Sequence, residues 1–598
     1  MKRLILLLLM MTLLTGCTAL ASGYDFTFSN RELSGSWEQK AAVTITGQGN
    51  TCTISGKGAN LDGTTLTISD EGVYVLSGSF NGHILIAAGD KDKVQLVLNN
   101  ATIASPAGPA IQAESADKVF ITAAAGTQNH LSDSTADVAD ASADAVIFSR
   151  ADLCLNGAGI LTIQGNHKHG VVSKDDLVIA GTTLTVTAAS TALEGKDCIL
   201  MTDSTVTVTA GKNGLRSDNA EDAFRGYIYI ADSTLTITAG TDGIQAETLL
   251  RTDNAVLTIL TSEGSGEITT SAGNDWGMWG GRGGWSRTTT ESTGSWKALK
   301  AGNAIEINEG TYTIDSQDDC LHSNGNLSIT GGSFSLKSGD DSIHADNELL
   351  ISGGDIVIHQ SYEGIEASKL TITGGQLDVT ASDDGLNAAG GADGSATADR
   401  SGRGMFSNGV GEIVISGGYI HINARGDGID SNNTILVSGG VTLVSGSPSG
   451  GNSAFDYDGE ATVTGGVLIA TGGSGMAQSF TAAENQGCML FGLNGGPAGR
   501  SLAIVDASNR IVAAYTPENS YSAVVVTAPE LQVGNTYSVV IDAVIEGADD
   551  HGFATNATYT GGTVLGTIEM TTALQGGSGH SMGGGPGRGP GGGRRPGW

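Results

Sequence analysis

Apolar and polar residues alternate in short runs along most of the chain, and glycine-rich corners separate the runs. Leu370 and Ile372 are apolar with polar neighbours, and the same alternation returns at Leu377 and Val379 after a Gly-Gly pair. Alternation with period two predicts short β-strands that bury one face. Glycine and aspartate between such runs are typical of tight corners. The pattern therefore predicts a chain built from short strands and corners, with almost no helix.

The alternation belongs to a repeat of about 22 residues. Copies of the template L-x-I-x-G-G-x-L-x-V-x-(A/S)-x-(D/E)-(D/G)-G-(I/L)-x-(A/S) begin at Leu327, Leu349 and Leu370, and weaker copies begin at Leu177, Ile199 and Ile228. Three short strands and three corners fill one period, so successive coils must stack in parallel. We therefore predict an all-β fold, a right-handed parallel β-helix whose hand follows the usual crossover preference. A sandwich or a propeller fits less well, because a propeller blade needs about 40 or more residues.

The extent of the repeat sets the expected domains. They are a signal peptide at 1–17, a linker at 18–35, the β-helix at 36–475, a small C-terminal β-domain at 476–575 and a Gly/Pro/Arg-rich disordered tail at 576–598. Two insertions, 262–300 and 389–411, interrupt the repeat, and insertions of this size are uncommon unless they are functional or disordered. We expect the C-terminal domain to cover the open end of the β-helix and its unpaired strand edge.

The first residues predict export and a lipid anchor. A short positive region, Met1-Lys2-Arg3, precedes an apolar run that ends in Leu14-Thr15-Gly16-Cys17. The run is too short to span a bilayer, and its ending fits a bacterial lipobox. We therefore expect Cys17 to carry a diacylglycerol and to anchor the protein to the outer face of the cell membrane. The alternative is an ordinary secretory signal with an incidental cysteine.

The composition narrows the choice of partners. The chain has 63 acidic and 30 basic residues, and its formal net charge is -33. Such a field repels nucleic acids and anionic membrane surfaces, and it suits a surface that binds divalent cations. The cysteines other than Cys17 lie far apart, without a C-x-x-C pair, so they do not indicate a zinc cluster.

Acidic residues recur at one corner of the repeat. Stacked coils rise by about 4.8 Å, so residues one period apart become neighbours, and their carboxylates repel one another. Calcium accepts six to eight oxygen ligands at about 2.3–2.6 Å and could lie between successive coils. The predicted ligands are Asp318, Asp319, Asp340, Asp341, Glu363, Glu366, Asp383, Asp384, Asp427 and Asp430. The sequence therefore predicts Ca²⁺ as the cofactor.

Two other interpretations of this corner stay open. Turn chemistry alone would have each aspartate bond its own backbone and each glycine take a positive φ, although it does not require doubled acids. Zinc is a minor alternative, because His322 and His344 follow the acidic positions by three residues while thiolate pairs are lacking.

Several longer segments carry a resemblance to a known family. They are "GVYVLSGSFNGHILIAAGDKDKVQLVLNNATI" (72–103), "PAIQAESADKVFITAAAGTQNHLSD" (109–133), "NHKHGVVSKDDLVI" (166–179) and "DGIQAE" (242–247). With these segments the chain resembles the calcium-binding, right-handed β-helix carbohydrate-binding family typified by a clostridial cellulose- and pectin-binding surface protein. The resemblance implies binding of cellulose-like and acidic polysaccharides, bound calcium, and a fold shared with certain pectate lyases.

The leading hypothesis is a calcium-dependent surface lipoprotein that holds a polysaccharide along the flank of the β-helix. Threonine, serine and aspartate side chains on the flank could bond sugar hydroxyls. Trp276, Trp279 and Trp285 in the first insertion could stack on sugar rings, as amphipathic aromatic side chains do. The alternative for these tryptophans is that they merely pack on the coils.

Two other classes of function compete with binding. A polysaccharide lyase needs a base and a cation to hold the uronate carboxylate, and Lys337 is the candidate base, although a solvated strand lysine fits it better. The acids form a ladder and not an isolated pair in a cleft, which disfavours a glycoside hydrolase. A structural adhesin or spacer is the third class, in which calcium would serve stability alone.

Overall fold

The computed structural model describes residues 23–135, 142–266, 295–388 and 411–576. The chain divides into two compact units. The first unit comprises Met1–Ser382 and Asn387–Ile413, and the second unit comprises Asp383–Leu386 and Val414–Trp598. Within the described ranges, no helix is long and apolar enough to cross a membrane.

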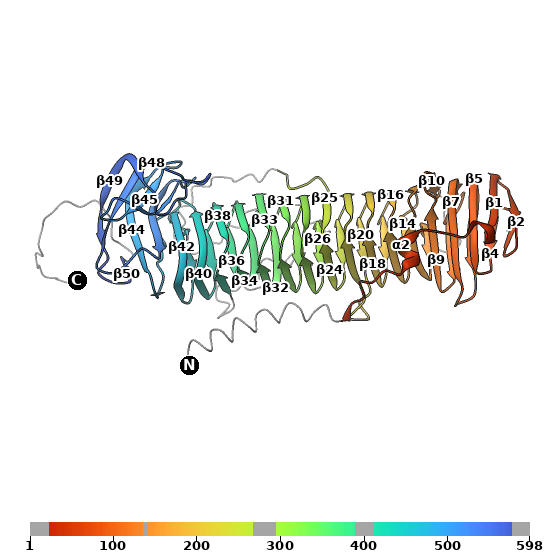
Figure 1. Ribbon diagram of the computed structural model, residues 1–598, viewed down its shortest axis with the longest axis horizontal. Coiled ribbons are helices and arrows are strands. Elements are labelled where there is room, and N and C mark those ends of the chain that lie inside the picture. The colour runs from red at the N-terminus through yellow and green to blue at the C-terminus, as the bar shows by residue number, and fades with distance from the viewer. Residues whose placement is uncertain (1–22, 136–141, 267–294, 389–410, 577–598) are drawn as a thin grey trace, which may run out of the picture. The chain divides into compact units, whose positions relative to one another are not determined.

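Coils of three short strands make up most of the first unit, and each strand pairs in parallel with its counterpart in the next coil (Figure 1). One face, the threonine face, consists of β10 (Gln128–Ser132), β13 (Ile160–Gly165), β16 (Thr183–Ala188), β19 (Thr205–Ala210), β22 (Thr234–Ala239), β25 (Ala255–Thr261), β28 (Gly310–Ser316), β31 (Ser333–Ser338), β33 (Asp355–Gln360) and β35 (Gln376–Ala381). This parallel stacking confirms the predicted β-helix.

The other two faces complete each coil. The short-strand face consists of β11 (Ala145–Ser149), β14 (His169–Ser173), β17 (Leu193–Gly195), β20 (Leu215–Ser217), β23 (Ile244–Ala246), β26 (Leu299–Ala301) and β29 (Leu321–Ser323). The strap face consists of β9 (Lys118–Ala123), β12 (Asp152–Asn156), β15 (Asp176–Ala180), β18 (Cys198–Thr202), β21 (Tyr227–Ala231), β24 (Leu249–Asp253), β27 (Ala304–Ile307) and β30 (Asn326–Ile329). β32 (Ile343–Ile351) and β34 (Ile365–Ile372) each run through both faces.

The first coils of this unit are less regular. They contain β1 (Val43–Gly49), β2 (Cys52–Ser55), β3 (Ala59–Asp62), β4 (Thr65–Ile68), β5 (Gly72–Phe80), β6 (His83–Ala87), β7 (Lys93–Ala104) and β8 (Ile111–Ser115). The pairs β1–β2 and β3–β4 are antiparallel, whereas β1 pairs in parallel with β5 and β4 with β6. Antiparallel turns near the end of a stack agree with the irregularity that terminal repeats usually show.

Apolar side chains fill the inside of the coils in columns. Leu215 pairs in register with Ile244, Ile244 with Leu299, and Leu299 with Leu321, and all of them are fully buried. Leu299 marks a coil between 297 and 316 that the repeat template did not reveal, because the insertion before it conceals the period. Full burial of one such side chain stabilises the fold by about 1.5–3 kcal/mol.

Glycine has different roles at the two kinds of corner. The second glycine of a Gly-Gly pair takes a left-handed conformation, as at Gly332 (φ 102°) and Gly354 (φ 100°). At the acidic corner Gly243 has no such φ, but a Cβ there would lie 2.6 Å from the carbonyl oxygen of Ala298 and 2.7 Å from Cγ2 of Ile259. Close stacking of the next coil, and not the turn conformation, therefore requires glycine at this corner.

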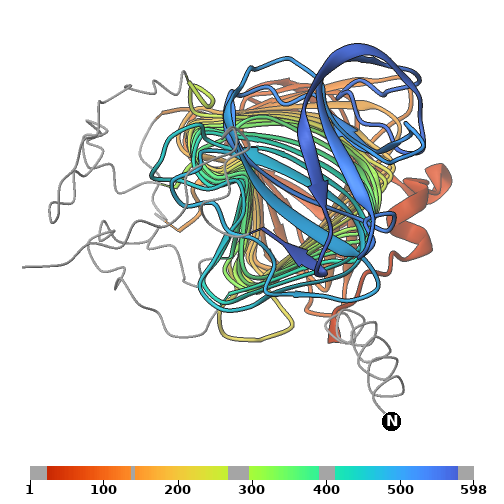
Figure 2. The same ribbon diagram turned by 90° about the vertical axis from the view of Figure 1, so that its left-hand side faces the viewer.

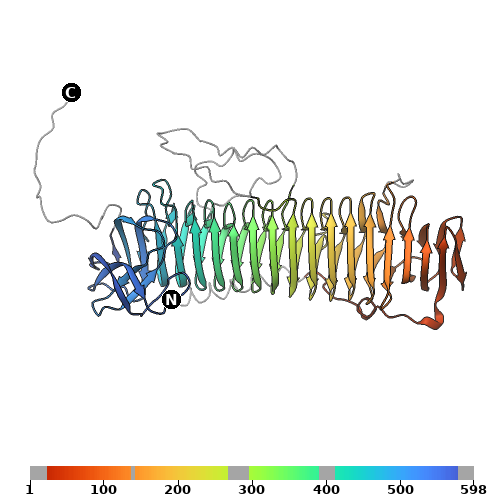
Figure 3. The same ribbon diagram turned by 90° about the horizontal axis from the view of Figure 1, so that it is seen from above.

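An N-terminal strap, residues 23–36, lies along the strap face and includes α2 (Asn30–Ser34). Figure 2 and Figure 3 show this red segment outside the coils. The Tyr227 hydroxyl donates to the Asp25 carbonyl at 2.6 Å, the Phe26 and Tyr229 rings lie 4.7 Å apart, and Asn156 Nδ2 donates to the Glu32 carbonyl at 2.9 Å. The described part of the expected linker thus covers apolar side chains of this face.

The second unit contains the last coils and an antiparallel domain. Its coil strands are β38 (Tyr419–Ala424), β39 (Ile429–Ser431), β40 (Thr434–Ser445), β41 (Asp456–Tyr457), β42 (Ala461–Gly472) and β43 (Ala482–Ala483). The strands after them are β44 (Gly487–Gly496), β45 (Leu502–Val505), β46 (Ile511–Tyr515), β47 (Tyr521–Ala528), β48 (Thr536–Ile545), β49 (Tyr559–Glu569) and β50 (Leu574–Gln575). β47 pairs antiparallel with β42 and covers its edge, as the sequence predicted.

Gly243→Ala tests the packing role of glycine at the acidic corner. We expect the change to lower the free energy of unfolding by about 1–3 kcal/mol, because the added methyl group forces the coil at Ala298 away. Urea unfolding followed by circular dichroism measures the difference. The control is Gly450→Ala, where a Cβ would meet nothing within 4 Å. Equal stability of the two variants would contradict the packing explanation.

Candidate metal sites

The predicted acidic ligands gather in three groups whose ligand atoms lie within 4.8 Å of one another. The first cluster is Asp318, Asp319 and Asp340, the second is Asp341, His344 and Glu366, and the third is Asp384, Asp427 and Asp430. The two remaining predicted residues have other contacts. Glu363 Oε2 accepts a hydrogen bond from Asn387 Nδ2 at 2.6 Å, and the Asp383 carbonyl accepts one from the Gly426 amide at 2.9 Å.

Corner aspartates hold the next coil through one carboxylate oxygen. Asp319 Oδ1 accepts from the Asp341 amide at 3.1 Å, and Asp384 Oδ1 accepts from the Asp427 amide at 2.6 Å. These bonds run to the following coil, whereas turn chemistry alone predicted bonds to the aspartate's own backbone. The second oxygen of Asp319, Oδ2, faces a cation, because Lys297 Nζ lies 2.7 Å from it.

A buried lysine supplies positive charge in the first cluster. Lys297 Nζ lies 2.7 Å from Asp319 Oδ2 and 3.2 Å from Asp318 Oδ1, and its side chain is 0% exposed. Burial acts to raise the pKa of Asp319, but the charge of Lys297, the hydrogen bond with His322 and the charges of His322 and His344 together hold this pKa below its usual range. The chain therefore provides a cation where we expected calcium, and calcium at Asp318 and Asp319 stays a prediction.

The second cluster joins two coils through a histidine. His344 Nδ1 lies 3.3 Å from Asp341 Oδ2 and 3.1 Å from Glu366 Oε2, while His344 Nε2 lies 3.0 Å from Asp346 Oδ1. Burial and then the charge of Glu363 raise the pKa of Asp341 well above its usual value. The other Asp341 oxygen, Oδ1, is buried and has no hydrogen-bond partner. Buried polar atoms nearly always have a partner, and a bound ion or water is one way to supply it.

The third cluster is made of carboxylates alone. Burial, and then the charges of Asp427, Asp456 and Asp458, raise the pKa of Asp430 to about 7. Burial also raises the pKa of Asp427 to about 6, and the charges of Asp456 and Asp383 add to this effect. These side chains are half-buried. Half-buried like charges at this distance destabilise the fold, and an all-oxygen donor set with high negative charge is the kind that Ca²⁺ prefers.

A fourth group, Asp152, Asp175 and Asp176, lies at a different corner of the first unit. Here cationic side chains pair with the acids, because Lys118 Nζ lies 3.5 Å from Asp152 Oδ2 and Arg225 Nη1 lies 2.9 Å from Asp176 Oδ1. The adjacent pair Asp175-Asp176 was a signal in the sequence that the ten predicted ligands did not include.

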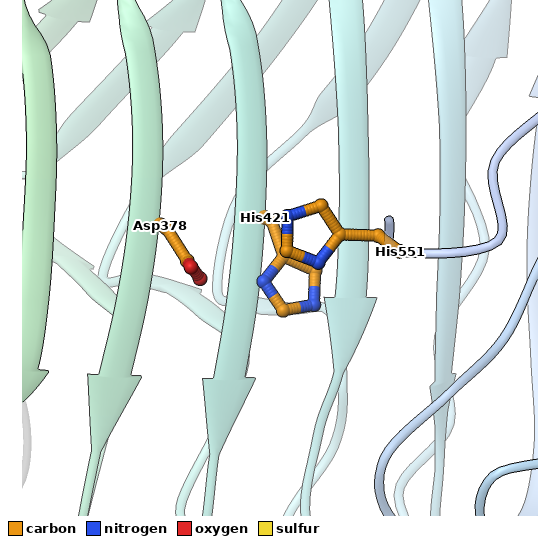
Figure 4. Close-up of side chains that lie close together, drawn as sticks. All are labelled: Asp378, His421 and His551. Carbon is orange, nitrogen blue, oxygen red and sulfur yellow. The ribbon is translucent and has the colours of Figure 1, made fainter. Parts of the chain in front are cut away.

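Two histidines of the second unit stack ring on ring (Figure 4). The His421 and His551 centroids lie 3.8 Å apart with a 24° interplanar angle. His421 Nε2 lies 2.9 Å from Glu518 Oε1, and the Tyr515 hydroxyl donates to Glu518 Oε2 at 3.0 Å. Burial acts to raise the pKa of Glu518, but the hydrogen bond and charge of His421, together with the hydrogen bonds from the backbone and from Tyr515, lower it overall. The group fastens the antiparallel domain to β38.

The other predicted site residues fall into two classes. Lys337 is exposed on β31 and pairs in register with Asp315 and Gln360. Its role as a lyase base stays a prediction. The lipidation site and the three loop tryptophans lie outside the described residues: Cys17, Trp276, Trp279 and Trp285.

Lys297→Met tests whether the lysine neutralises the first cluster. We expect the free energy of unfolding to fall by about 3–5 kcal/mol, because the change leaves buried carboxylates without their cation. The double variant Lys297→Met/Asp319→Asn should recover part of this loss, since it also removes one of the charges. Urea unfolding of both variants measures the coupling, and simple additivity of the single effects would contradict the role assigned to Lys297.

A family model and a curated relative that match this chain have the same description. Residues 62–342 and 341–535 match the family described as carbohydrate-binding domain-containing protein. An Acetivibrio thermocellus protein of that description is 34% identical over 139 residues, 22% of this chain and 49% of the relative. The chain thus covers about half the length of that curated relative.

A solved structure is also similar in part. It is the gadolinium derivative of the polysaccharide lyase-like protein from C. thermocellum, which is 28% identical. The match covers 37% of this chain and 91% of that chain with a TM-score of 0.36. The family match extends over most of the sequence and agrees with the predicted resemblance. The chain therefore belongs to the family of carbohydrate-binding domain-containing proteins.

Proposed function

We propose that the protein is a calcium-dependent, polysaccharide-binding surface lipoprotein that takes cellulose-like or acidic pectin-like glycans. Membership of a carbohydrate-binding family is the observation that carries this proposal. The proposal includes a lipid anchor at Cys17 and a place on the outer face of the cell membrane. A formal net charge of -33 disfavours nucleic acids as partners.

The glycan lies along the threonine face of the first unit. Thr207 pairs in register with Thr236, and Thr236 with Thr258, and all three side chains are exposed. Adjacent strands lie about 4.8 Å apart and alternate residues about 6.6 Å apart, so the hydroxyls form a flat, regular array. Each hydroxyl can donate one hydrogen bond and accept two, which matches the hydroxyls of a sugar chain.

The same face offers apolar contacts, whereas a second face is partly covered. Val256 and Leu260 on β25 are 42% and 37% exposed and flank Thr258. Such side chains can contact the apolar C–H surface of a sugar ring. The N-terminal strap lies over part of the strap face, and its Tyr24 hydroxyl donates to the Ala223 carbonyl at 3.3 Å. The threonine face is therefore the better surface for a long chain.

Calcium binds at the third cluster. Asp384, Asp427 and Asp430 bring ligand atoms within 4.8 Å of one another, and Ca²⁺ accepts six to eight oxygens at about 2.3–2.6 Å. The ion offsets the repulsion between these half-buried carboxylates and ties successive corners of the second unit together. Calcium thus stabilises the stacked corners of the second unit.

Asp430→Asn tests calcium at the third cluster. Saturating Ca²⁺ should raise the melting temperature of the chelator-treated chain, because a ligand at 100 times its Kd stabilises the native state by about 2.7 kcal/mol. Asp430→Asn should lose much of this shift, and without calcium it should melt above the unsubstituted chain, since it lacks one of the mutually repelling half-buried charges. Differential scanning calorimetry with and without chelator measures both effects.

Asp550→Asn is the control, because Asp550 is an exposed acid of the same unit. It should respond to calcium as the unsubstituted chain does. An unchanged calcium response in Asp430→Asn contradicts a site at the third cluster.

The triple variant Thr207→Val/Thr236→Val/Thr258→Val tests the glycan surface. Valine keeps the shape and removes the hydroxyl, so retention on insoluble cellulose or pectin should fall by about tenfold or more, given ~0.5–1.5 kcal/mol per hydrogen bond. Pull-down with graded amounts of glycan, with and without chelator, measures the affinity.

The matched control is Thr560→Val/Thr563→Val/Thr567→Val, which changes exposed threonines on β49 of the second unit. It should bind as the unsubstituted chain does. Equal binding by both triple variants argues against the threonine face, and no retention of the unsubstituted chain on any glycan argues against the function itself.

A further inference from the structure

The second cluster brings one nitrogen and two carboxylate oxygens together inside the first unit. β32 and β34 pair in register at His344 and Glu366, and Asp341 stands at the corner that precedes β32. His344 Nδ1 lies 3.3 Å from Asp341 Oδ2 and 3.1 Å from Glu366 Oε2. A tetrahedral ion with bonds of about 2.0–2.1 Å has ligand–ligand edges of about 3.3 Å. The two distances from His344 Nδ1 match such edges, and the ligand atoms of all three residues lie within 4.8 Å of one another.

Asp346 fixes which nitrogen of His344 faces the cluster. His344 Nε2 lies 3.0 Å from Asp346 Oδ1, and Nδ1 lies within hydrogen-bond distance of Asp341 and Glu366. A metal bound at Nδ1 would take the place of the Nδ1 proton, while Nε2–H would donate to Asp346. Metal-binding histidines almost always donate their second N–H to a carboxylate or a carbonyl in this way. The partner carboxylate orients the ring and makes the binding nitrogen more basic.

A buried oxygen without a partner gives an independent indication of a ligand. Asp341 is 4% exposed, and its Oδ1 accepts no hydrogen bond. Asn387, 2% exposed, donates through Nδ2 to Glu363, while its Oδ1 is also buried without a partner. Native proteins rarely leave such atoms unsatisfied.

We propose that Asp341, His344 and Glu366 form a site for a divalent transition-metal ion of the zinc class. Imidazole nitrogen suits zinc, cobalt, nickel and iron, whereas calcium and magnesium take oxygen ligands. The second cluster thus differs in chemistry from the all-carboxylate third cluster. Its occupation does not depend on glycan binding or on calcium at Asp430.

The preceding coil provides a natural comparison. His322 pairs in register with His344, and the two rings stack with centroids 4.8 Å apart. His322 Nδ1 lies 2.7 Å from Asp319 Oδ2, but the same oxygen also receives the ammonium of Lys297 at 2.7 Å. His322 Nε2 meets the amide oxygen of Asn324 at 2.8 Å in place of a carboxylate. In the first cluster the carboxylate oxygen beside the histidine thus already has a cationic partner, the ammonium of Lys297.

Cobalt(II) binding tests the site on the full chain, prepared without a histidine tag and freed of metal by chelation. Titration in millimolar calcium should give one Co²⁺ per chain with visible d–d absorption, and Zn²⁺ should displace it. His344→Gln should weaken binding by at least about 100-fold, because it removes the nitrogen ligand. Asp346→Asn should weaken it about 10–100-fold, the usual effect of losing an outer-shell partner.

His322→Gln is the matched control and should bind Co²⁺ as the unsubstituted chain does. The proposal is overturned if the chain binds no Co²⁺, if calcium displaces it, or if His344→Gln binds equally well. It is also overturned if His421→Gln, at the other histidine pair, abolishes the signal instead. Should His344→Gln misfold by circular dichroism, Asp346→Asn decides, and full affinity in that variant counts against the site.

Discussion

The parallel register of the coils is the constraint on which the rest of the structure depends. Each strand bonds its counterpart one period later, so every side chain lies beside the equivalent side chain of the next coil, about 4.8 Å away. Columns of leucine and isoleucine, such as Leu215 with Ile244, are stabilised by this geometry because apolar side chains of successive coils pack against one another. Columns of carboxylates are destabilised by the same geometry. A chain that repeats an acidic corner must therefore bring a cation to each coil.

The acidic corner meets this requirement differently along the stack. Lys297 places its ammonium between Asp318 and Asp319, whereas His344 contributes a ring nitrogen that Asp346 orients. In the third cluster the charges that raise the pKa of Asp430 are those of carboxylates. The backbone arrangement is shared, since corner aspartates bond the next coil's amide in the first and third clusters. In the first cluster the cation comes from Lys297, one coil before Asp319. In the second cluster the nitrogen comes from His344, three residues after Asp341. These neighbouring residues thus decide which cation each corner needs.

The repeat alone predicted the strands, the parallel pairing and the grouping of the acids, because a period of about 22 residues leaves few ways to bury one face. The coil at Leu299 was missed, although Lys297 stands 22 residues before Asp319, because the insertion before it breaks the visible period. Burial of the cluster could not be foreseen either, since exposure depends on what packs over a corner. The reason for glycine at position 243 could not be foreseen either, because a clash with Ala298 is a contact between coils and leaves no local signal in the sequence.

Different residues of a coil serve stability and binding. Inward residues are fixed by the apolar columns, and the corners are fixed by charge and by close approach at glycines such as Gly243. The strap covers part of one face and packs Phe26 on Tyr229. Outward-facing residues of the threonine face neither pack in the core nor form a corner. Threonine can therefore recur there in register without destabilising the core. A periodic ligand such as a polysaccharide suits this arrangement, because a surface that repeats at fixed spacing can bind successive sugars through equivalent contacts.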